Sequence, residues 1–274
     1  MNSLFAEIDI NGRVQRLEYG WIDATHADAP LAVFLHEGLG SLAMWRDFPR
    51  ALCAAAGMRG LVYSRYGYGR STPRPSAEKW PVDFMHEQAH AVLPALFARL
   101  GIEEPPWLFG HSDGGSIALL YAAAFPARIA GLVAVAPHVF VEDVSVASIE
   151  LARVAYEATD LRRRLGRYHD DPDSAFRGWN DIWLDPAFRA WNIEQCLPRI
   201  RCPVLAVQGE GDEYGTMAQI DAIARVVPHA RLLKLPACGH SPHRDQPAVL
   251  TDAVVAFLNE HRQVPARPVL ATPT

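Results

Sequence analysis

The sequence of 274 residues has no long run of one charge sign, no long apolar stretch and no paired-cysteine motif. Its 26 basic and 31 acidic residues are interspersed and give a formal net charge of −5, which argues against nucleic acid or an anionic membrane as a partner. No apolar stretch reaches the roughly 18 residues that a bilayer span requires. We therefore expect neither a nucleic-acid-binding nor a membrane-bound protein.

The four cysteines Cys53, Cys196, Cys202 and Cys238 form no C-x-x-C pair. The N-terminal stretch MNSLFAEIDINGR carries acids where a secretory signal needs basic and then apolar residues. We expect free thiols and a cytoplasmic location, with the protein a monomer or a homodimer.

Apolar residues make up 50% of the chain and charged residues 21%, a composition that excludes disorder. Residues 4–10 and 16–24 flank Asn11-Gly12, a strong hairpin signal. Six short apolar runs follow, typical of strands buried on both faces of a parallel sheet. These runs cover residues 31–36, 60–64, 105–111, 129–137, 202–209 and 230–236.

Helical patterns lie between the apolar runs, so the fold class is α/β with right-handed crossovers. Ser41 is expected to cap the first helix, and Pro94 to bend or interrupt the second. The predicted helices cover residues 41–56, 83–100, 114–125, 217–227 and 246–261.

Residues 138–200 break the alternation of strands and helices, since they contain no buried-strand run but many aromatic residues. An insertion of this size predicts a helical cap over one edge of the sheet. The α/β core then comprises 1–137 and 201–262, and residues 263–274 form a loose, proline-containing tail.

The segment WLFGHSDGGSIALL contains G-x-S-x-G between a predicted strand and a predicted helix. This is the context in which small residues allow a sharp turn that lifts a nucleophilic serine above the sheet. Ser112 is therefore the candidate nucleophile, with a simple helix cap before the two glycines as the structural alternative.

A serine nucleophile needs a base, and the base needs a carboxylate that orients it. His240 directly follows Gly239 after the last strand and is preferred to His243, which is expected at the loop or rim. The acid is expected to be Asp212, from the EGDEYG segment that also offers Glu210 and Glu213; Asp143 is the alternative.

Two backbone N–H groups are expected to stabilise the oxyanion, those of Asp113 and Gly38, with Leu39 as the fallback for Gly38. This chemistry requires no cofactor and no metal. The spacing of His240, His243 and Asp245 matches no strong zinc pattern.

The segments HEGLGS (36–41), SRYGYGRS (64–71), GHSDGG (110–115), EGD (210–212) and GH (239–240) follow one another along the chain. In this order they resemble the α/β-hydrolase superfamily, and within it the biphenyl-hydrolase-like, valacyclovir-hydrolase branch. The resemblance implies a mostly parallel eight-stranded sheet with helices on both faces. Glu37 replaces a glycine common in relatives, and Ser64-Arg65-Tyr66 replaces D-x-R, a change expected to concern loop anchoring.

The predicted function is a serine hydrolase that cleaves a small or medium carboxylic ester through an acyl-enzyme. Thioester or C–C bond hydrolysis is the alternative chemistry, and a non-catalytic ligand-binding protein is the alternative of another class. The predicted substrate contacts are Glu37, Trp179, Trp183 and Trp191, although cap packing explains the tryptophans equally well. Acids at 37 and 113 facing the cavity would favour an ammonium-bearing ester.

Overall fold

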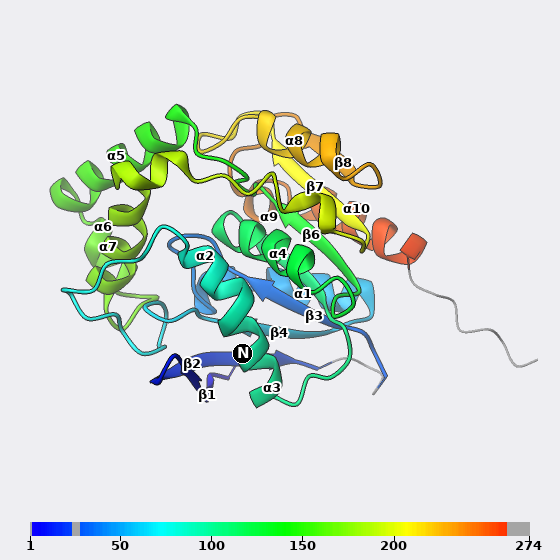
Figure 1. Ribbon diagram of the computed structural model, residues 1–274, viewed down its shortest axis with the longest axis horizontal. Coiled ribbons are helices and arrows are strands. Elements are labelled where there is room, and N and C mark those ends of the chain that lie inside the picture. Colours follow the sequence, from blue (N-terminus) through cyan, green and yellow to red (C-terminus); the bar gives the residue numbers. More distant parts are fainter. Residues whose placement is uncertain (1, 24–27, 262–274) are drawn as a thin grey trace, which may run out of the picture.

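The computed structural model describes residues 2–23 and 28–261 and contains an eight-stranded sheet in the order β1-β2-β4-β3-β5-β6-β7-β8 (Figure 1). Strands β4, β3, β5, β6, β7 and β8 pair in parallel, whereas β2 is antiparallel to both of its neighbours. The predicted mostly parallel α/β fold is confirmed. The strands are β1 Leu4–Ile10, β2 Arg13–Ile22, β3 Leu31–Leu35, β4 Arg59–Tyr63, β5 Trp107–His111, β6 Gly131–Val135, β7 Val204–Gly209 and β8 Arg231–Leu235.

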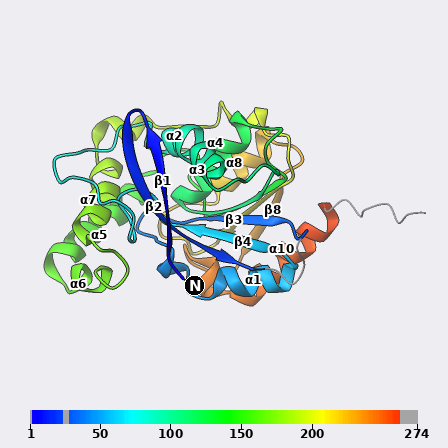
Figure 2. The ribbon, with the colours of Figure 1, turned by 90° about the horizontal axis from the view of Figure 1, so that it is seen from below.

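Helices cover both faces of the sheet, with α1 and α10 on one face and α2, α3, α4 and α8 on the other (Figure 2). Successive residues of a strand point to opposite faces, so Val33 and Leu35 join one apolar core and Phe34 joins the other. The central strands need apolar residues at every position for this reason. The helices are α1 Phe48–Ala56, α2 Phe84–Glu87, α3 Leu93–Arg99, α4 Asp113–Ala124, α8 Ala218–Val226, α9 Pro242–Asp245 and α10 Pro247–His261.

The hairpin turn forms at Asn11-Gly12, where both residues have positive φ, 56° and 81°. Asparagine and glycine tolerate this conformation better than other residues, which explains the signal in the sequence. The predicted second strand ended at residue 24, which lies outside the described residues.

Two helix expectations change in detail. Ser41 caps no helix: a 3₁₀ turn covers Ala43–Trp45 and α1 begins only at Phe48. Before Pro94 the chain forms a π turn over Gln88–Val92. Proline cannot donate an N–H and crowds the carbonyl four residues before it, and the wider π turn accommodates both.

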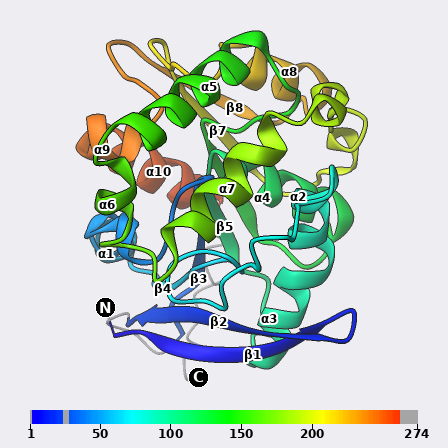
Figure 3. The same ribbon diagram turned by 90° about the vertical axis from the view of Figure 1, so that its left-hand side faces the viewer.

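The segment between β6 and β7 contributes no strand to the sheet within residues 138–200, all of which are described. Its helices α5 Asp143–Ala158, α6 Leu161–Leu165 and α7 Pro172–Trp183 lie beside one another across one end of the sheet (Figure 3). The predicted tail, 263–274, lies outside the described residues. Across the described ranges, no helix has both the length and the apolar character to cross a membrane.

Candidate active site

Ser112 sits at the turn between β5 and α4 in a strained conformation, with φ 54° and ψ −121°. The two flanking glycines permit this turn because the backbone passes very close to itself. A Cβ on Gly110 would lie 2.2 Å from the carbonyl oxygen of Gly114, and one on Gly114 would lie 2.1 Å from that of Leu35. A strained non-glycine residue at a strand–helix turn is typical of a functional side chain.

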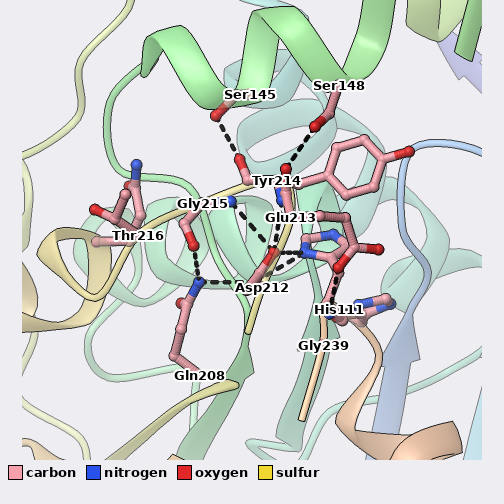
Figure 4. A network of polar contacts seen from close by, with 12 residues as sticks. His111, Ser145, Ser148, Gln208, Asp212, Glu213, Tyr214, Gly215, Thr216 and Gly239 are labelled. Carbon is pink, nitrogen blue, oxygen red and sulfur yellow. Dashed lines mark hydrogen bonds and ion pairs between the residues drawn. The ribbon is translucent and has the colours of Figure 1, made fainter. Parts of the chain in front are cut away.

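Asp212 and His240 are hydrogen-bonded: the imidazole Nδ1–H lies 2.8 Å and 3.0 Å from the two carboxylate oxygens. The amide of Gln208 and the backbone N–H of Tyr214 also donate to this carboxylate, at 2.7 Å and 2.8 Å (Figure 4). Burial opposes ionisation, but the hydrogen bonds and the nearby imidazole outweigh it, and the pKa of Asp212 is lowered. Asp212 is therefore a carboxylate at neutral pH and orients the ring.

The backbone of His240 is held on both sides. The carbonyl of His240 accepts a hydrogen bond from Nε2–H of His111, at 2.7 Å, and its N–H donates to the Glu213 carboxylate at 3.1 Å. The N–H of Gly239 donates to Asp245 at 2.9 Å. His111 directly precedes Ser112, so this contact links the two loops.

Ser112 and His240 line one cavity of about 410 Å³. Within the described part of the chain, the Ser112 hydroxyl and the His240 ring do not share a hydrogen bond. Nδ1 is engaged by Asp212, so Nε2 is the nitrogen left to accept a proton. In enzymes without substrate, the distance between a nucleophile and its base is often long and shortens only when substrate binds.

The expected oxyanion donors lie beside this cavity. Gly38 and Leu39 line it, and Asp113 follows Ser112 as the first residue of α4, where an N–H has no intrahelical acceptor. No described residue accepts a hydrogen bond from the N–H of Gly38. Trp179 packs directly on Gly38, since a Cβ there would lie 2.1 Å from the indole ring.

Arg65 connects the two loops that carry these donors. Its guanidinium donates to the carbonyl of Glu37 at 2.8 Å and lies 3.7 Å from the carboxylate of Asp113. The Glu37 carbonyl and the Gly38 N–H belong to one planar trans peptide and point in opposite directions. The Gly40 N–H and the His36 Nδ1–H also donate to the Glu37 carbonyl, at 3.0 Å and 2.7 Å, so Arg65 is one of three donors that hold this peptide and orient the Gly38 N–H.

The carboxyl group of Asp113 faces away from substrate. Its side chain is fully buried, accepts a hydrogen bond from the indole N–H of Trp183 at 3.2 Å, and does not line the cavity. Burial raises the pKa of Asp113, although the Arg65 charge and the Trp183 bond oppose that change. The condition for an ammonium-binding pair of acids is therefore not met.

Glu37 lines the cavity but is already engaged. Its carboxylate lies 3.3 Å from Arg244 and 3.6 Å from Nδ1 of His111. Burial disfavours its charge, yet His111 and Arg244 outweigh this effect and hold the pKa of Glu37 well below its usual range. The acid is thus ionised and locally neutralised.

Two further buried histidines surround the pair and are uncharged. Burial and neighbouring positive charge lower the pKa of His138 to about 3 and that of His243 to about 2. His243 packs between Trp45 and Phe48, with ring centroids 5.0 Å and 5.6 Å away. The expected rim position of His243 is wrong, because its ring fills an aromatic pocket.

Some predicted positions lie away from the cavity. Trp191 does not line it and stacks on Phe188, with centroids 5.4 Å apart, so its expected substrate contact is not present. Asp143, the alternative acid, has a 93% exposed side chain paired with Arg189. Trp179 and Trp183 do line the cavity.

Several lining residues escaped prediction. His138 and Tyr214 place their rings 6.0 Å and 4.8 Å from that of His240, and Ile149 and Leu161 approach from α5 and α6. His138 directly follows a predicted apolar run, a position that could have indicated it. The others carry no local signal, because only the tertiary structure brings them to the cavity.

The described residues contain no group of three or more histidines, cysteines or acids arranged to hold a metal ion. The His240, His243 and Asp245 set does not converge, since His240 faces Asp212 while Asp245 binds the Gly239 backbone.

Comparison with known proteins places this chain among hydrolases. Residues 32–253 match the alpha/beta hydrolase family. Proline iminopeptidase of Thermoplasma volcanium is 26% identical over 75% of this chain and 81% of its own length. Human serine hydrolase BPHL is 28% identical over 67% of this chain and 63% of its own length.

Solved structures agree with this fold. The enol-lactonase of Burkholderia xenovorans superposes with a TM-score of 0.72 and 22% identity, over 93% of this chain and all of that one. A bacterial membrane phospholipase A gives a TM-score of 0.74 and 20% identity, over 95% of this chain and 87% of that one. The resemblance to the biphenyl-hydrolase-like branch is confirmed, and the chain belongs to the alpha/beta hydrolase family.

Proposed function

We propose that this hydrolase cleaves a small or medium carboxylic ester with Ser112 as nucleophile, His240 as base and Asp212 as the orienting acid. The observation that carries the proposal is the Asp212–His240 hydrogen bond of 2.8 Å, which orients a ring that lines the same cavity as Ser112. Serine, histidine and acid occur in the chain order expected for this type of elbow.

The geometry of the site supports acylation of Ser112 as the first step. Nε2 of His240 takes the Ser112 proton as the hydroxyl oxygen attacks the acyl carbon, and Asp212 stabilises the imidazolium that forms. The negative charge that develops on the substrate oxygen is met by the N–H groups of Asp113 and Gly38. Collapse of this intermediate releases the alcohol, which receives the proton from His240.

Deacylation follows the same steps, with water in place of the serine hydroxyl. His240 removes a proton from a water molecule that attacks the acyl-enzyme, and Ser112 regains its proton when the acid leaves. The buried uncharged rings of His138 and His243 suit this cycle, since neither adds a second positive charge beside the imidazolium.

The size and lining of the cavity support a small or medium acyl group. Its volume of about 410 Å³ lies toward the lower end of the range for small-molecule sites. Trp179 and Trp183 of α7 and Ile149 of α5 supply apolar walls, which supports residues 138–200 as a cap over the core 1–137 and 201–262. The cytoplasmic location and the monomeric or homodimeric state stay predictions from the sequence.

Thioester and C–C bond hydrolysis use the same residues and are separated from ester hydrolysis by a panel. Purified protein is assayed with oxygen esters, thioesters and a carbon–carbon substrate that share one acyl group. We expect the highest kcat/KM on the oxygen ester. A higher value on another member would replace the proposed reaction type and leave the triad in place.

Covalent labelling tests the triad and the non-catalytic alternative. We expect a fluorophosphonate to label the protein and Ser112→Ala to abolish both labelling and esterase activity, the latter by at least about 10³-fold. Ser76→Ala, at an exposed serine that does not line the cavity, is the control and should keep the label. Labelling that survives in Ser112→Ala would refute Ser112 as the nucleophile. If neither the wild type nor Ser112→Ala is labelled, a non-catalytic binding protein is favoured.

A further inference from the structure

Among the residues that the structure describes, the charged ones that line the candidate cavity are one acid, Glu37, and the four arginines Arg46, Arg164, Arg167 and Arg244. The chain as a whole carries a net charge of −5, so the sign at the cavity is opposite to that of the protein. Charge concentrated in a cleft focuses its field there and attracts ligands of the other sign.

These arginines come from separate segments. Arg46 follows the 3₁₀ turn Ala43–Trp45, Arg164 belongs to α6, Arg167 follows α6, and Arg244 lies on α9. Folding therefore brings together, at the mouth of the cavity, four guanidinium groups that come from different parts of the sequence.

Arg164 and Arg167 form no ion pair with a described acid, whereas two neighbouring arginines do. Arg162 and Arg163, on the same short helix, pair with Asp173 and Asp160 at 2.6 Å each. Arg164, Arg167 and also Arg46 are exposed, and no described acid forms an ion pair with any of them.

The fourth arginine is already used. Arg244 lies 3.3 Å from Glu37, so that acid and that arginine neutralise each other. The unpaired charges that the described residues bring to the cavity are therefore all positive. Arg46 and Arg167 also border a neighbouring hollow of about 800 Å³, so they stand where a substrate longer than the first cavity would leave it.

We infer that the substrate carries an anionic group, a carboxylate or a phosphate, that is held at the mouth by Arg46, Arg164 and Arg167 while its ester carbonyl lies at Ser112. Guanidinium groups bind both kinds of oxyanion with paired N–H donors. An ammonium group in the same place would meet three unpaired positive charges. The inference rests on the proposed serine hydrolase.

The test uses para-nitrophenyl esters of one acyl chain length that end in a carboxylate, a phosphonate, a carboxamide or an ammonium group. We expect the wild type to prefer an anionic ester to the neutral carboxamide by about tenfold in kcat/KM, mainly through KM. The triple variant Arg46→Gln, Arg164→Gln, Arg167→Gln should reduce this ratio to near one.

A second triple variant controls for the change in net charge. Arg50, Arg99 and Arg153 are exposed and do not line the cavity, so their replacement by glutamine should leave the ratio unchanged. A preference for the phosphonate over the carboxylate would identify phosphate as the recognised group, and the reverse would identify a carboxylate.

The inference is overturned if the wild type treats anionic and neutral esters alike, if it prefers the ammonium ester, or if the mouth variant keeps the anionic preference. Each of these results leaves the proposed function intact as long as fluorophosphonate labels Ser112. Absence of labelling and of hydrolysis with every ester would instead refute the proposed function itself.

Discussion

Arginine occupies two opposite environments in this site. Arg65 is almost fully buried and is held by the Glu37 carbonyl and the Asp113 carboxylate. Arg164 and Arg167 are exposed at the mouth and form no ion pair with a described acid. The same side chain is therefore a fixed structural element at the base of the site and an available ligand-binding group at its entrance.

The difference follows from access to water. A buried charge interacts strongly with its surroundings and needs partners in good geometry, so the Arg65 network is expected to govern positions and hence kcat. An exposed charge is screened and mobile, so the mouth arginines are expected to govern capture and hence KM.

The largest expected effect is at Asp212, in the buried region. Asp212→Asn keeps the shape but removes the charge and the acceptor that fix the His240 tautomer, and we expect kcat to fall by about 10⁴-fold. Glu210→Gln, on the same loop and exposed, should retain activity. A loss of less than tenfold in Asp212→Asn would show that another acid serves His240.

Arg65→Met should come next. It leaves the Asp113 carboxylate buried without its cation, which costs about 3–5 kcal/mol in the free energy of unfolding. It also removes one of the three hydrogen bonds to the carbonyl of the peptide that carries the Gly38 N–H, so kcat should fall by about 10-fold with little change in KM. Urea unfolding and ester kinetics measure the two effects.

Two further variants keep this prediction testable. Adding Asp113→Asn should recover part of the lost stability but not kcat, because it removes the unpaired charge without restoring the anchor. Arg70→Met, at the exposed end of the same loop, should change neither quantity. Unchanged kcat in a folded Arg65→Met protein would contradict the positioning role.

A smaller effect is expected from salt, which separates the two regions without mutation. Raising ionic strength from about 20 mM to about 500 mM should increase KM for a carboxylate-bearing ester a few-fold, because the mouth charges are screened. The kcat value should stay constant, since the buried charges are shielded from counterions. Equal salt sensitivity for a neutral ester would contradict this division.

The smallest expected effect concerns Glu37, which lies between the two regions. Its pKa is lowered in the folded protein, so its ionisation adds stability above its ordinary pKa of 4.5, and this stability is lost as the pH falls further. Glu37→Gln lacks this titration, and its melting temperature should fall less on acidification below pH 4.5. Parallel melting curves for the two proteins would show that Glu37 contributes nothing.

Sequence patterns predicted the sheet well because a strand buried on both faces is apolar at nearly every position. The runs at 31–36 and 202–209 became β3 and β7 with ends displaced by at most two residues. Patterns served less well for Ser41, where a polar residue before a helical stretch indicated a cap. The chain instead forms a 3₁₀ turn that places the Trp45 ring in the core.

The candidate triad could be predicted from the sequence for a related reason. Ser112 and Asp212 follow the buried strands β5 and β7, His240 follows the edge strand β8, and parallel strands bring their carboxyl ends to one edge. The surroundings of the Trp191 side chain and of the Asp113 carboxyl could not be predicted in this way. An aromatic or acidic residue has the same letter whether it faces a cavity or packs against a neighbour, and only the packing decides.

The order of strands and helices, the strained turn at Ser112 and the loops that carry His240 and Asp212 can be inferred from the residues alone, because they depend on local periodicity and on glycine placement. Which charges are neutralised depends on how the chain folds. Arg65 and Arg164 are chemically identical, but one folds against a buried carboxylate and the other projects into water beside the cavity. Desolvation, which depends on the surrounding fold and not on residue type, makes that difference.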